Sequence, residues 1–464
     1  MPTNRSIDRR RSTIRHLGAV ALAAMVMIPL GCANPFDTSV DNPNAVVETA
    51  LADAAGATTL VNGQGASVTR ALTAILAPYS VATDELTWVG SREFWKNLDD
   101  GDVSDPVNEY TDGAYPFVSE ARWLSNFAIA RVTSFDAAAT LRNRRDLART
   151  NIFGAIIYIT IGDMFDDFVL ASDRTLAGAA VGTANMPIFY DSAIVMLDRA
   201  LPPAVAVADI ELQRQILALR ARAKFSKAER ATVFPSRAVP GNPLVNDAGA
   251  VADANAMLAL GGGTAIAWRY RLTPTANNLA GINIGFELNN RGELRAGNTF
   301  VNPDPARPIV PLAGLPGIAM IDPVTGVAST TIANAIDACC RPAVGNNIPM
   351  TVASAREMYL ILAESRLAAA DNAGFLTNIN LSRSVDGLPA YPDATGANTK
   401  LQYERKTQLY LQGRRLMDMY RFNAADVRWL TGNGVRGRCL LPITYIERLT
   451  NVSAPQPNNT RLCQ

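Results

Sequence analysis

Apolar residues recur at spacings of three and four through two long parts of the chain, and this pattern limits the possible folds more than any other feature. In "ELQRQILALRARAKFSKA", Leu212, Ile216, Leu219 and Ala223 fall on one stripe of a helix. Each such helix has to bury its stripe against a neighbour. The pattern predicts helices at about 44–56, 66–80, 116–134, 139–166, 187–201 and 208–229, and then from Thr351, at 374–383 and at 398–422.

The composition changes between about 230 and 350, where Pro, Gly and Asn become frequent, as in "FPSRAVPGNPLVND". Such composition is typical of loops and short strands. Trp268 and Tyr270 offer apolar burial there, which argues against a disordered linker. The sequence predicts a mostly α fold, a TPR-like α-solenoid with an irregular loop and short-strand insertion. Its parts are an N-terminal helical region (44–229), the irregular region (230–350) and a C-terminal helical region of the same domain (351–464).

The N-terminus has the pattern of an export signal. A basic stretch precedes the apolar run "LGAVALAAMVMIPLGC", which is too short for a comfortable membrane span. Residues 1–31 are predicted to be a lipoprotein signal peptide, Cys32 the lipidated residue and 32–43 a polar tether. An ordinary secretory signal with a chance cysteine is the alternative. The other apolar stretch, "NIFGAIIYITIGDMF", carries Asp163 and is predicted to be a buried helix.

Charge and histidine content exclude several classes of function. The formal net charge is +1, and removing residues 1–31 takes away five arginines and one aspartate, which leaves −3. A mildly acidic chain is a poor candidate for nucleic-acid binding. The single histidine, His16, lies in the predicted signal. The mature protein is therefore expected to have no Ser-His-Asp or Cys-His catalysis and no histidine-ligated metal.

Two acidic stretches are candidate sites. "DDGDVSDP" supplies carboxylates that could bind calcium, although a solvated acidic loop is favoured because the EF-hand pattern is incomplete: Asp99, Asp100, Asp102 and Asp105. "GDMFDD" offers Asp163, Asp166 and Asp167, and paired carboxylates are what a glycosidase needs. Acids at a helix end are common, so neither stretch predicts a cofactor.

Four cysteines remain besides Cys32: Cys339, Cys340, Cys439 and Cys463. They allow three pairings. We expect a disulfide between Cys439 and Cys463, because both lie in the same C-terminal tail. The adjacent Cys339 and Cys340 are expected to bond to each other or to remain free.

Several motifs, in this order, resemble those of the SusD/RagB-like outer-membrane lipoproteins. The resemblance begins with the lipid-attachment sequence and "DNPNAVVETAL" and continues through "ARTNIFGAIIYITIGDMFDD". "REMYLILAESRL" is similar to a family helix, matched by Glu357, Tyr359, Leu360, Ala363 and Glu364. "ERKTQLYLQGRRLMDMYRF" is similar to another, matched by Glu404, Arg405, Leu409, Gly413, Arg415, Asp418 and Arg421. The closing "LLPITYIERLTNVSAPQPNN" completes the resemblance, which covers nearly the whole mature chain.

The chain departs from the family pattern at a few positions. Ser354 stands where an arginine is usual, Gln408 and Gln412 replace glutamates, and Phe422 replaces a tryptophan. In this resemblance Gly413 lets a neighbouring helix approach closely.

The charged motif residues are expected to form structural ion pairs between helices. Glu357 and Glu364 are candidate partners across to the helix of Glu404 and Arg415. Within that helix, Arg414 and Asp418 have the i,i+4 spacing of an ion pair.

The resemblance implies a function at the cell surface. It implies a lipid-anchored protein of the outer membrane that faces the exterior, binds oligosaccharides or peptides and delivers them to a SusC-like TonB-dependent transporter. No catalysis and no cofactor are expected. The alternatives are a surface glycoside hydrolase that uses paired carboxylates and a helical scaffold without a ligand.

Aromatic side chains on loops suggest where such a ligand would bind, because sugar rings stack on exposed aromatic faces. "DELTWVGSREFWKNLDDGD" places Trp88 and Trp95 beside polar groups, with Arg92 as a polar contact. "GGGTAIAWRYRL" places Trp268 and Tyr270 after a run of glycines. Trp123 and Trp429 lie in or next to predicted helices and are expected to be core residues.

Overall fold

The structure is a computed structural model, and it describes residues 53–171, 177–260, 267–275, 283–302, 317–424, 429 and 438–454. The predicted signal peptide, Cys32, the tether, Cys463 and most of the predicted helix 44–56 lie outside the described residues.

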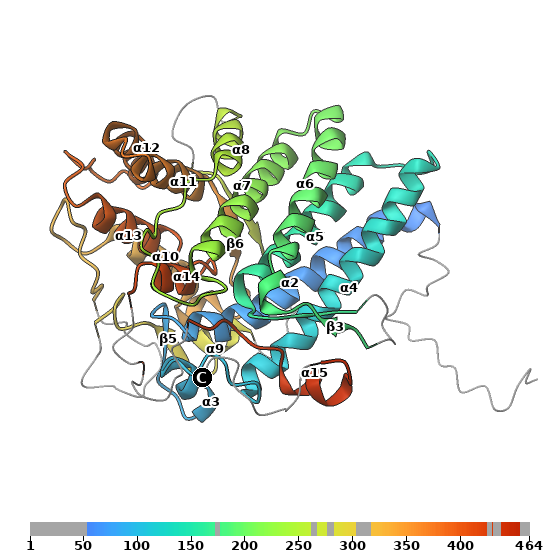
Figure 1. The fold of residues 1–464 in the computed structure, drawn as a ribbon, viewed down its shortest axis with the longest axis horizontal. Coiled ribbons are helices and arrows are strands. Elements are labelled where there is room, and N and C mark those ends of the chain that lie inside the picture. The colour runs from blue at the N-terminus through green and yellow to red at the C-terminus, as the bar shows by residue number, and fades with distance from the viewer. Residues whose placement is uncertain are drawn as a thin grey trace, which may run out of the picture. The chain divides into compact units, whose positions relative to one another are not determined.

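Helices that follow one another in sequence pack side by side through the first half of the described chain (Figure 1). Helix α2 packs against α4, α4 against α5, α5 against α6, α6 against α7 and α7 against α8. Their bounds are α2 Ala57–Val81, α4 Glu109–Ala137, α5 Arg144–Met164, α6 Ile188–Ala206, α7 Ile210–Val233 and α8 Ala248–Ala259. This stacking confirms the mostly α, TPR-like solenoid that the sequence predicts.

The predicted stripe explains why α7 forms and where it lies. Leu212, Ile216, Leu219 and Ala223 are all buried. The helix begins where Asp209 caps it, its side chain accepting a hydrogen bond from the backbone N–H of Leu212. Helix α5 is buried along its whole length from residue 151 to 164. No helix among the described residues is long and apolar enough to cross a membrane.

The C-terminal helices continue the same packed unit. Helix α11 contacts α8, α12 and α13, which joins them to the preceding solenoid. Their bounds are α11 Ala355–Ala368, α12 Asn372–Ser384, α13 Ala397–Gln408, α14 Arg415–Arg421 and α15 Tyr445–Thr450.

Three short antiparallel strand pairs join distant segments. Strand β1 (Leu86–Trp88) pairs with β5 (Leu294–Ala296), and β2 (Val169–Leu170) pairs with β3 (Ala179–Ala180). Strand β4 (Arg269–Leu272) pairs with β6 (Met350–Ser354), with a register shift between Tyr270 and Arg271. The β4–β6 pair forms part of the cavity described below.

The prediction of an irregular region at 230–350 is wrong in part. Besides β4 and β5 it contains α8, α9 (Ile284–Asn289) and α10 (Thr330–Cys339). Helix α8 is rich in alanine, and Asp247 caps it by accepting the N–H of Ala250 at 2.7 Å. Because the region as a whole is rich in Pro, Gly and Asn, its composition did not indicate these short helices. The sequence also missed α3 (Glu93–Asp99).

Two predicted helix bounds change for local reasons. The segment from Thr351 begins as strand β6, and α11 starts only after Ser354, whose hydroxyl accepts the N–H of Glu357. The predicted helix 398–422 is two helices, since the chain turns between Gln408 and Arg415. Leu411 and Gly413 in that turn have φ of +54° and +70°, in the left-handed region that ends a right-handed helix.

Candidate functional site

The turn between α13 and α14 places Gly413 against α5. A Cβ atom on Gly413 would lie 2.6 Å from Cε of Met164, and its φ is one that favours glycine. The close approach expected for Gly413 is therefore present, but in a turn rather than inside a helix. The turn also directs Arg414 into the protein. Arg414 binds Asp163 through Nη1 and donates from Nη2 to Glu229 at 2.6 Å.

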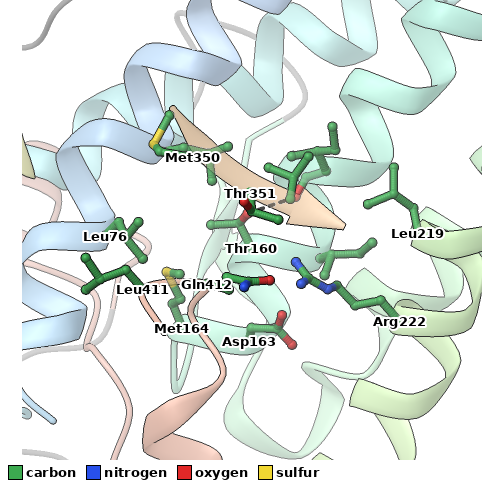
Figure 2. A pocket seen from close by; sticks show the side chains of 14 residues that line it. Leu76, Thr160, Asp163, Met164, Leu219, Arg222, Met350, Thr351, Leu411 and Gln412 are labelled. Atoms are coloured by element: carbon green, nitrogen blue, oxygen red, sulfur yellow. Dashed lines mark hydrogen bonds between the residues drawn. The ribbon is translucent and has the colours of Figure 1, made fainter. Parts of the chain in front are cut away.

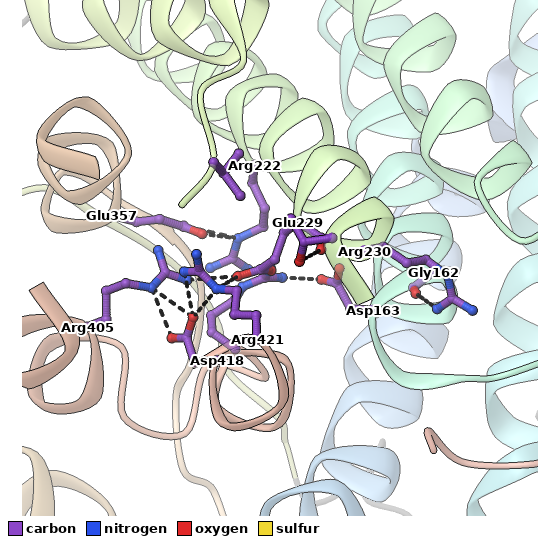
Figure 3. A network of polar contacts seen from close by, with 12 residues as sticks. Gly162, Asp163, Arg222, Glu229, Arg230, Glu357, Arg405, Asp418 and Arg421 are labelled. Carbon is purple, nitrogen blue, oxygen red and sulfur yellow. Dashed lines mark hydrogen bonds and ion pairs between the residues drawn. The ribbon is translucent and has the colours of Figure 1, made fainter. Parts of the chain in front are cut away.

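A buried network of arginines and carboxylates surrounds this turn (Figure 3). Arg405 donates from Nε to both oxygens of Asp418, at 2.9 Å each. Arg421 donates to Glu364 and to Asp418, the latter from Nη2 at 2.8 Å. Both arginines also face Glu229, at 3.2 and 3.1 Å. The network joins α7, α11, α13 and α14.

Carboxylates outnumber arginines at the centre of this network, where Arg405, Arg414 and Arg421 meet Asp163, Glu229, Glu364 and Asp418. Burial raises the pKa of Glu229 to about 7, although Arg414, Arg421 and Arg405 act to lower it. Burial also disfavours the charged form of Asp418, but Arg405 and Arg421 outweigh it and hold its pKa well below the usual value. These paired, buried arginines and carboxylates hold the helices together and offer no exposed surface to a substrate.

The other charged motif residues pair with partners that the sequence did not identify. Glu357 accepts hydrogen bonds from Arg222, and Glu404 accepts them from Arg383 and Tyr391. The expected partners of Arg415 are wrong, because Arg415 binds Asp84. The expected Arg414–Asp418 ion pair is also wrong, since Arg414 extends to Asp163 and Glu229, and Asp418 to Arg405 and Arg421.

The carboxylates of the two acidic stretches form hydrogen bonds and ion pairs within the protein. Asp163 contacts Arg414 and Tyr190, Asp166 pairs with Arg237, and Asp167 accepts the N–H groups of Phe168 and Gly182. In the other stretch, Asp99 accepts from Thr87 and Asp100 pairs with Lys96. Among the described residues there is no group of His, Cys, Asp and Glu side chains that could hold a metal ion.

The fold places the residues of the first predicted ligand stretch in different elements and at different depths. The prediction that Trp95 is an exposed aromatic residue on a loop is wrong. Trp95 lies in α3, is fully buried, and stacks on Tyr110 with ring centroids 3.5 Å apart. Its indole N–H donates to Glu287 at 3.3 Å. Trp88 is half-buried at the end of β1. Arg92 is exposed and lies 3.6 Å from Glu109.

The second predicted stretch lies at β4. Trp268 is half-buried and donates from Nε1 to the carboxylate of Glu211 at 2.9 Å. Tyr270 is half-buried on β4, and burial raises the pKa of its hydroxyl. The ligand-binding role of Trp88, Arg92, Trp268 and Tyr270 stays a prediction. Of the two tryptophans expected in the core, Trp429 is buried and Trp123 is half-buried, with its ring stacked on Phe127.

A cavity of about 420 Å³ lies between the β4–β6 pair, α10 and the turn after α13. This volume is within the range of small-molecule sites. None of the five predicted ligand residues lines it. Its charged lining residues are Arg269 and Arg271 of β4, Arg356 of α11 and Asp386. Hydroxyl and amide groups come from Thr331, Asn334, Thr351, Thr407, Gln408 and Gln412.

A smaller cavity of about 40 Å³ (Figure 2) shares five lining residues with the large one: Leu76, Met350, Thr351, Leu411 and Gln412. Arg222 lines this cavity, and its buried Nη2 has no hydrogen-bond partner among the described residues. Oε1 of Gln412 is likewise buried without a partner there. The volume is sufficient for a water molecule, which could satisfy both groups.

Comparison with known proteins identifies the fold. No family model matches the chain, and no curated protein matches its sequence significantly. Solved structures do match. A putative sugar binding protein from Bacteroides vulgatus is 13% identical, with a TM-score of 0.59, over 88% of this chain and 99% of that one. The chain has the SusD-like fold.

Two further solved structures have this SusD-like fold. A SusD superfamily protein from Parabacteroides distasonis is 14% identical, with a TM-score of 0.58, over 90% of this chain and 100% of that one. A SusD-like carbohydrate binding protein from Bacteroides vulgatus is 11% identical, with a TM-score of 0.53, over 88% and 98%. The similarity extends along nearly the whole length of each protein.

The arginines that line the cavity of this SusD-like fold are not among the site residues that the sequence predicts. Arg269 and Arg271 lie on either side of Tyr270, in the stretch whose aromatic rings predict a ligand site. Alternate residues of a strand point to one face. If 269–272 is known to be a strand, "RYRL" therefore indicates that its two arginines share a face. The sequence alone did not define that strand.

The structure shows the pairing of two cysteines of the SusD-like domain. Cys339 and Cys340 form a disulfide with each other at the end of α10, and Cys339 lines the large cavity. Cys439 is fully buried. Its expected partner Cys463 lies outside the described residues, so that disulfide stays a prediction.

Proposed function

We propose that the chain is a surface lipoprotein of the outer membrane that binds oligosaccharides and delivers them to a SusC-like TonB-dependent transporter. The SusD-like fold supports this proposal, because proteins with that fold include ones described as carbohydrate-binding and sugar-binding. Peptides are the alternative ligand. The cavity of about 420 Å³ is the single observation that carries the binding role.

The lining of the cavity suits a sugar. Hydroxyl, amide and guanidinium groups converge on it from α10, α13, β4 and β6, and these are the donors and acceptors that match sugar hydroxyls. Apolar groups of Ile284, Ile348 and Pro349 supply surface for a ring face. Polar groups placed on an otherwise apolar wall are typical of small-molecule sites.

The positions of the carboxylates support a protein that binds its ligand without catalysis. A glycosidase needs two carboxyl groups facing an open cleft, one of them free to donate a proton. The candidates Asp163, Asp166 and Asp167 are buried and bonded within the protein. Asp386 at the cavity is held by Arg356 and Thr331.

Calorimetry tests the ligand class. The protein from residue 33 onward would be titrated with neutral glycans, acidic glycans and a peptide digest, and each mixture assayed for new reducing ends. Saturable glycan binding without new reducing ends is expected. Release of reducing ends would favour the hydrolase alternative, and the absence of any binding would favour the scaffold.

The anchor and the transporter are tested in the native membrane. Cys32→Ala should move the protein from the membrane to the soluble fraction, because the lipid is attached to the thiol. The wild-type protein should co-purify with a SusC-like barrel in mild detergent. Unchanged membrane association of Cys32→Ala, or recovery of the protein alone while the barrel is present, would contradict these parts of the proposal.

A further inference from the structure

We propose that the large cavity binds an anionic oligosaccharide, with Arg269 and Arg271 holding a carboxylate or sulfate group of the sugar. This inference rests on the proposed function and narrows it to a class of ligand. It begins from the charge balance of the cavity. Among the described residues, three arginines line it against a single carboxylate, that of Asp386.

One of the three arginines is already neutralised. Arg356 is buried and forms an ion pair with Oδ1 of Asp386. Thr331 donates from its hydroxyl to the other oxygen of that carboxylate at 2.8 Å. Both oxygens of Asp386 are therefore engaged, and no other carboxylate among the described lining residues compensates the charges of Arg269 and Arg271.

Arg269 and Arg271 are available to a ligand. Arg269 is half-buried and Arg271 is exposed, and the side chain of neither forms an ion pair or hydrogen bond with any residue that the structure describes. This contrasts with Arg405, Arg414 and Arg421, which are buried and paired several times over. Unpaired guanidinium groups at a cavity are suited to bind a carboxylate or sulfate through two parallel hydrogen bonds.

The geometry of β4 brings the two arginines to the same place. Residues two apart on a strand are about 7 Å apart and point to one face. Both arginines line the cavity, and the pairing with β6, whose register shifts between Tyr270 and Arg271, holds β4 beside it. Two guanidinium groups at this separation can hold one anionic group between them, or one group each on adjacent sugars.

The rest of the cavity can bind the neutral part of the sugar. Thr331 and Asn334 of α10 and Thr407 of α13 line it together with the β4 arginines. Sugar hydroxyls can donate to and accept from such hydroxyl and amide groups. The arginines and these neutral groups therefore set an orientation for the ligand, with its anionic group towards β4.

Calorimetry on Arg269→Gln, Arg271→Gln and the double variant tests the inference. The probes are oligogalacturonate for carboxylates, a carrageenan oligosaccharide, which carries sulfate but no carboxylate, a neutral β-glucan oligosaccharide and an acidic peptide. Arg142→Gln, at an exposed arginine between α4 and α5, is the matched control for the loss of one charge. Thermal unfolding of all variants should match the wild type, because both cavity arginines retain solvent contact.

We expect at least one anionic probe to bind, tenfold or more weakly to each single variant, and Arg142→Gln to bind like the wild type. Binding should also weaken as salt increases. Which anionic probe binds distinguishes carboxylate from sulfate recognition. Neutral glycan binding that the variants do not change, with no anionic binding, would overturn this inference and leave the proposed function intact. Binding of an acidic peptide alone would overturn the sugar assignment, and no binding of any glycan would overturn both.

Discussion

Arg415 donates two hydrogen bonds to Asp84, from Nε to Oδ1 at 2.6 Å and from Nη2 to Oδ2 at 2.9 Å. The two residues are 331 positions apart in the chain. Lys406 adds a third contact to the same carboxylate at 2.7 Å. Burial disfavours the charged form of Asp84, but Arg415 and Lys406 hold its pKa well below the usual value. This ion pair joins the segment after α2 to the start of α14.

Arg415→Ala should destabilise the fold by about 3 kcal/mol, because it leaves a buried carboxylate with one cation instead of two. The matched control is Lys96→Ala, which removes an exposed i,i+4 ion pair with Asp100 and should cost less than about 1 kcal/mol. Urea unfolding measures both. Equal shifts of the two midpoints would show that the Arg415–Asp84 pair contributes no more than a surface pair.

Gly413→Ala should destabilise the fold by about 2 kcal/mol or more. Alanine at a φ of +70° costs about 1–2 kcal/mol, and its Cβ would lie 2.6 Å from Cε of Met164. Gly396→Ala separates the two effects, since Gly396 has a φ of +67° and open space around it. Urea unfolding should show a larger loss for Gly413→Ala. A loss no larger than that of Gly396→Ala would mean that Met164 moves aside without cost.

Local patterns predicted most of the fold. The stripe that includes Leu212 and Ile216 located α7, because helix formation and burial depend on residues three or four apart. The continuous helix through Gly413 was a wrong prediction, because the turn there depends on contacts with α5, far away in sequence. The same holds for ion pairs: Arg414 finds Glu229, 185 residues earlier, and no local spacing indicates that partner.

The candidate site was less predictable than the fold. The sequence indicates that Trp95 is aromatic and near polar residues, but not that α3 buries it against Tyr110. Arg269 and Arg271 lie in a strand of four residues whose partner, β6, is about 80 positions away. Non-local pairing decides which face they line, so only the structure could assign them to the cavity.

Glu85 should make the stability of the fold depend on pH. Burial raises its pKa to about 8, although the N–H of Leu411 donates to Oε1 at 2.7 Å. Between about pH 4.5 and 8 the folded protein then holds a proton that the unfolded chain has released. Stability should therefore fall as the pH rises through this window, by up to about 1.4 kcal/mol per pH unit from this group.

Glu85→Gln removes this titration and keeps a hydrogen-bond acceptor for Leu411. Urea unfolding at pH 5, 6.5 and 8 should show similar stability of the two proteins at pH 5 and a smaller decline with pH in the variant. Parallel curves for wild type and variant would contradict the raised pKa of Glu85.

The expected Cys439–Cys463 disulfide would close a loop within the C-terminal tail. A loop of that size contributes about 3 kcal/mol in the chain-entropy model. Cys463→Ser should lower the urea midpoint accordingly, and peptide mapping without reduction should show the linked pair in the wild type. A Cys439 peptide that is free, or linked elsewhere, would contradict the pairing.

Trp95→Ala and Trp268→Ala should affect different properties: the first should lower stability, and the second should weaken glycan binding. Trp95 is fully buried, stacks on Tyr110 and donates to Glu287, so its removal leaves a cavity and takes one hydrogen bond from a carboxylate that Arg291 still pairs; the loss should cost about 3–5 kcal/mol. Trp268 is half-buried, and its indole contacts Glu211, so removing it should cost much less stability. If Trp268 forms part of the sugar site next to β4, its variant should instead weaken glycan binding in calorimetry while thermal unfolding stays near that of the wild type. Unchanged binding by Trp268→Ala would remove it from the ligand site, and a small loss of stability in Trp95→Ala would contradict its role in the core.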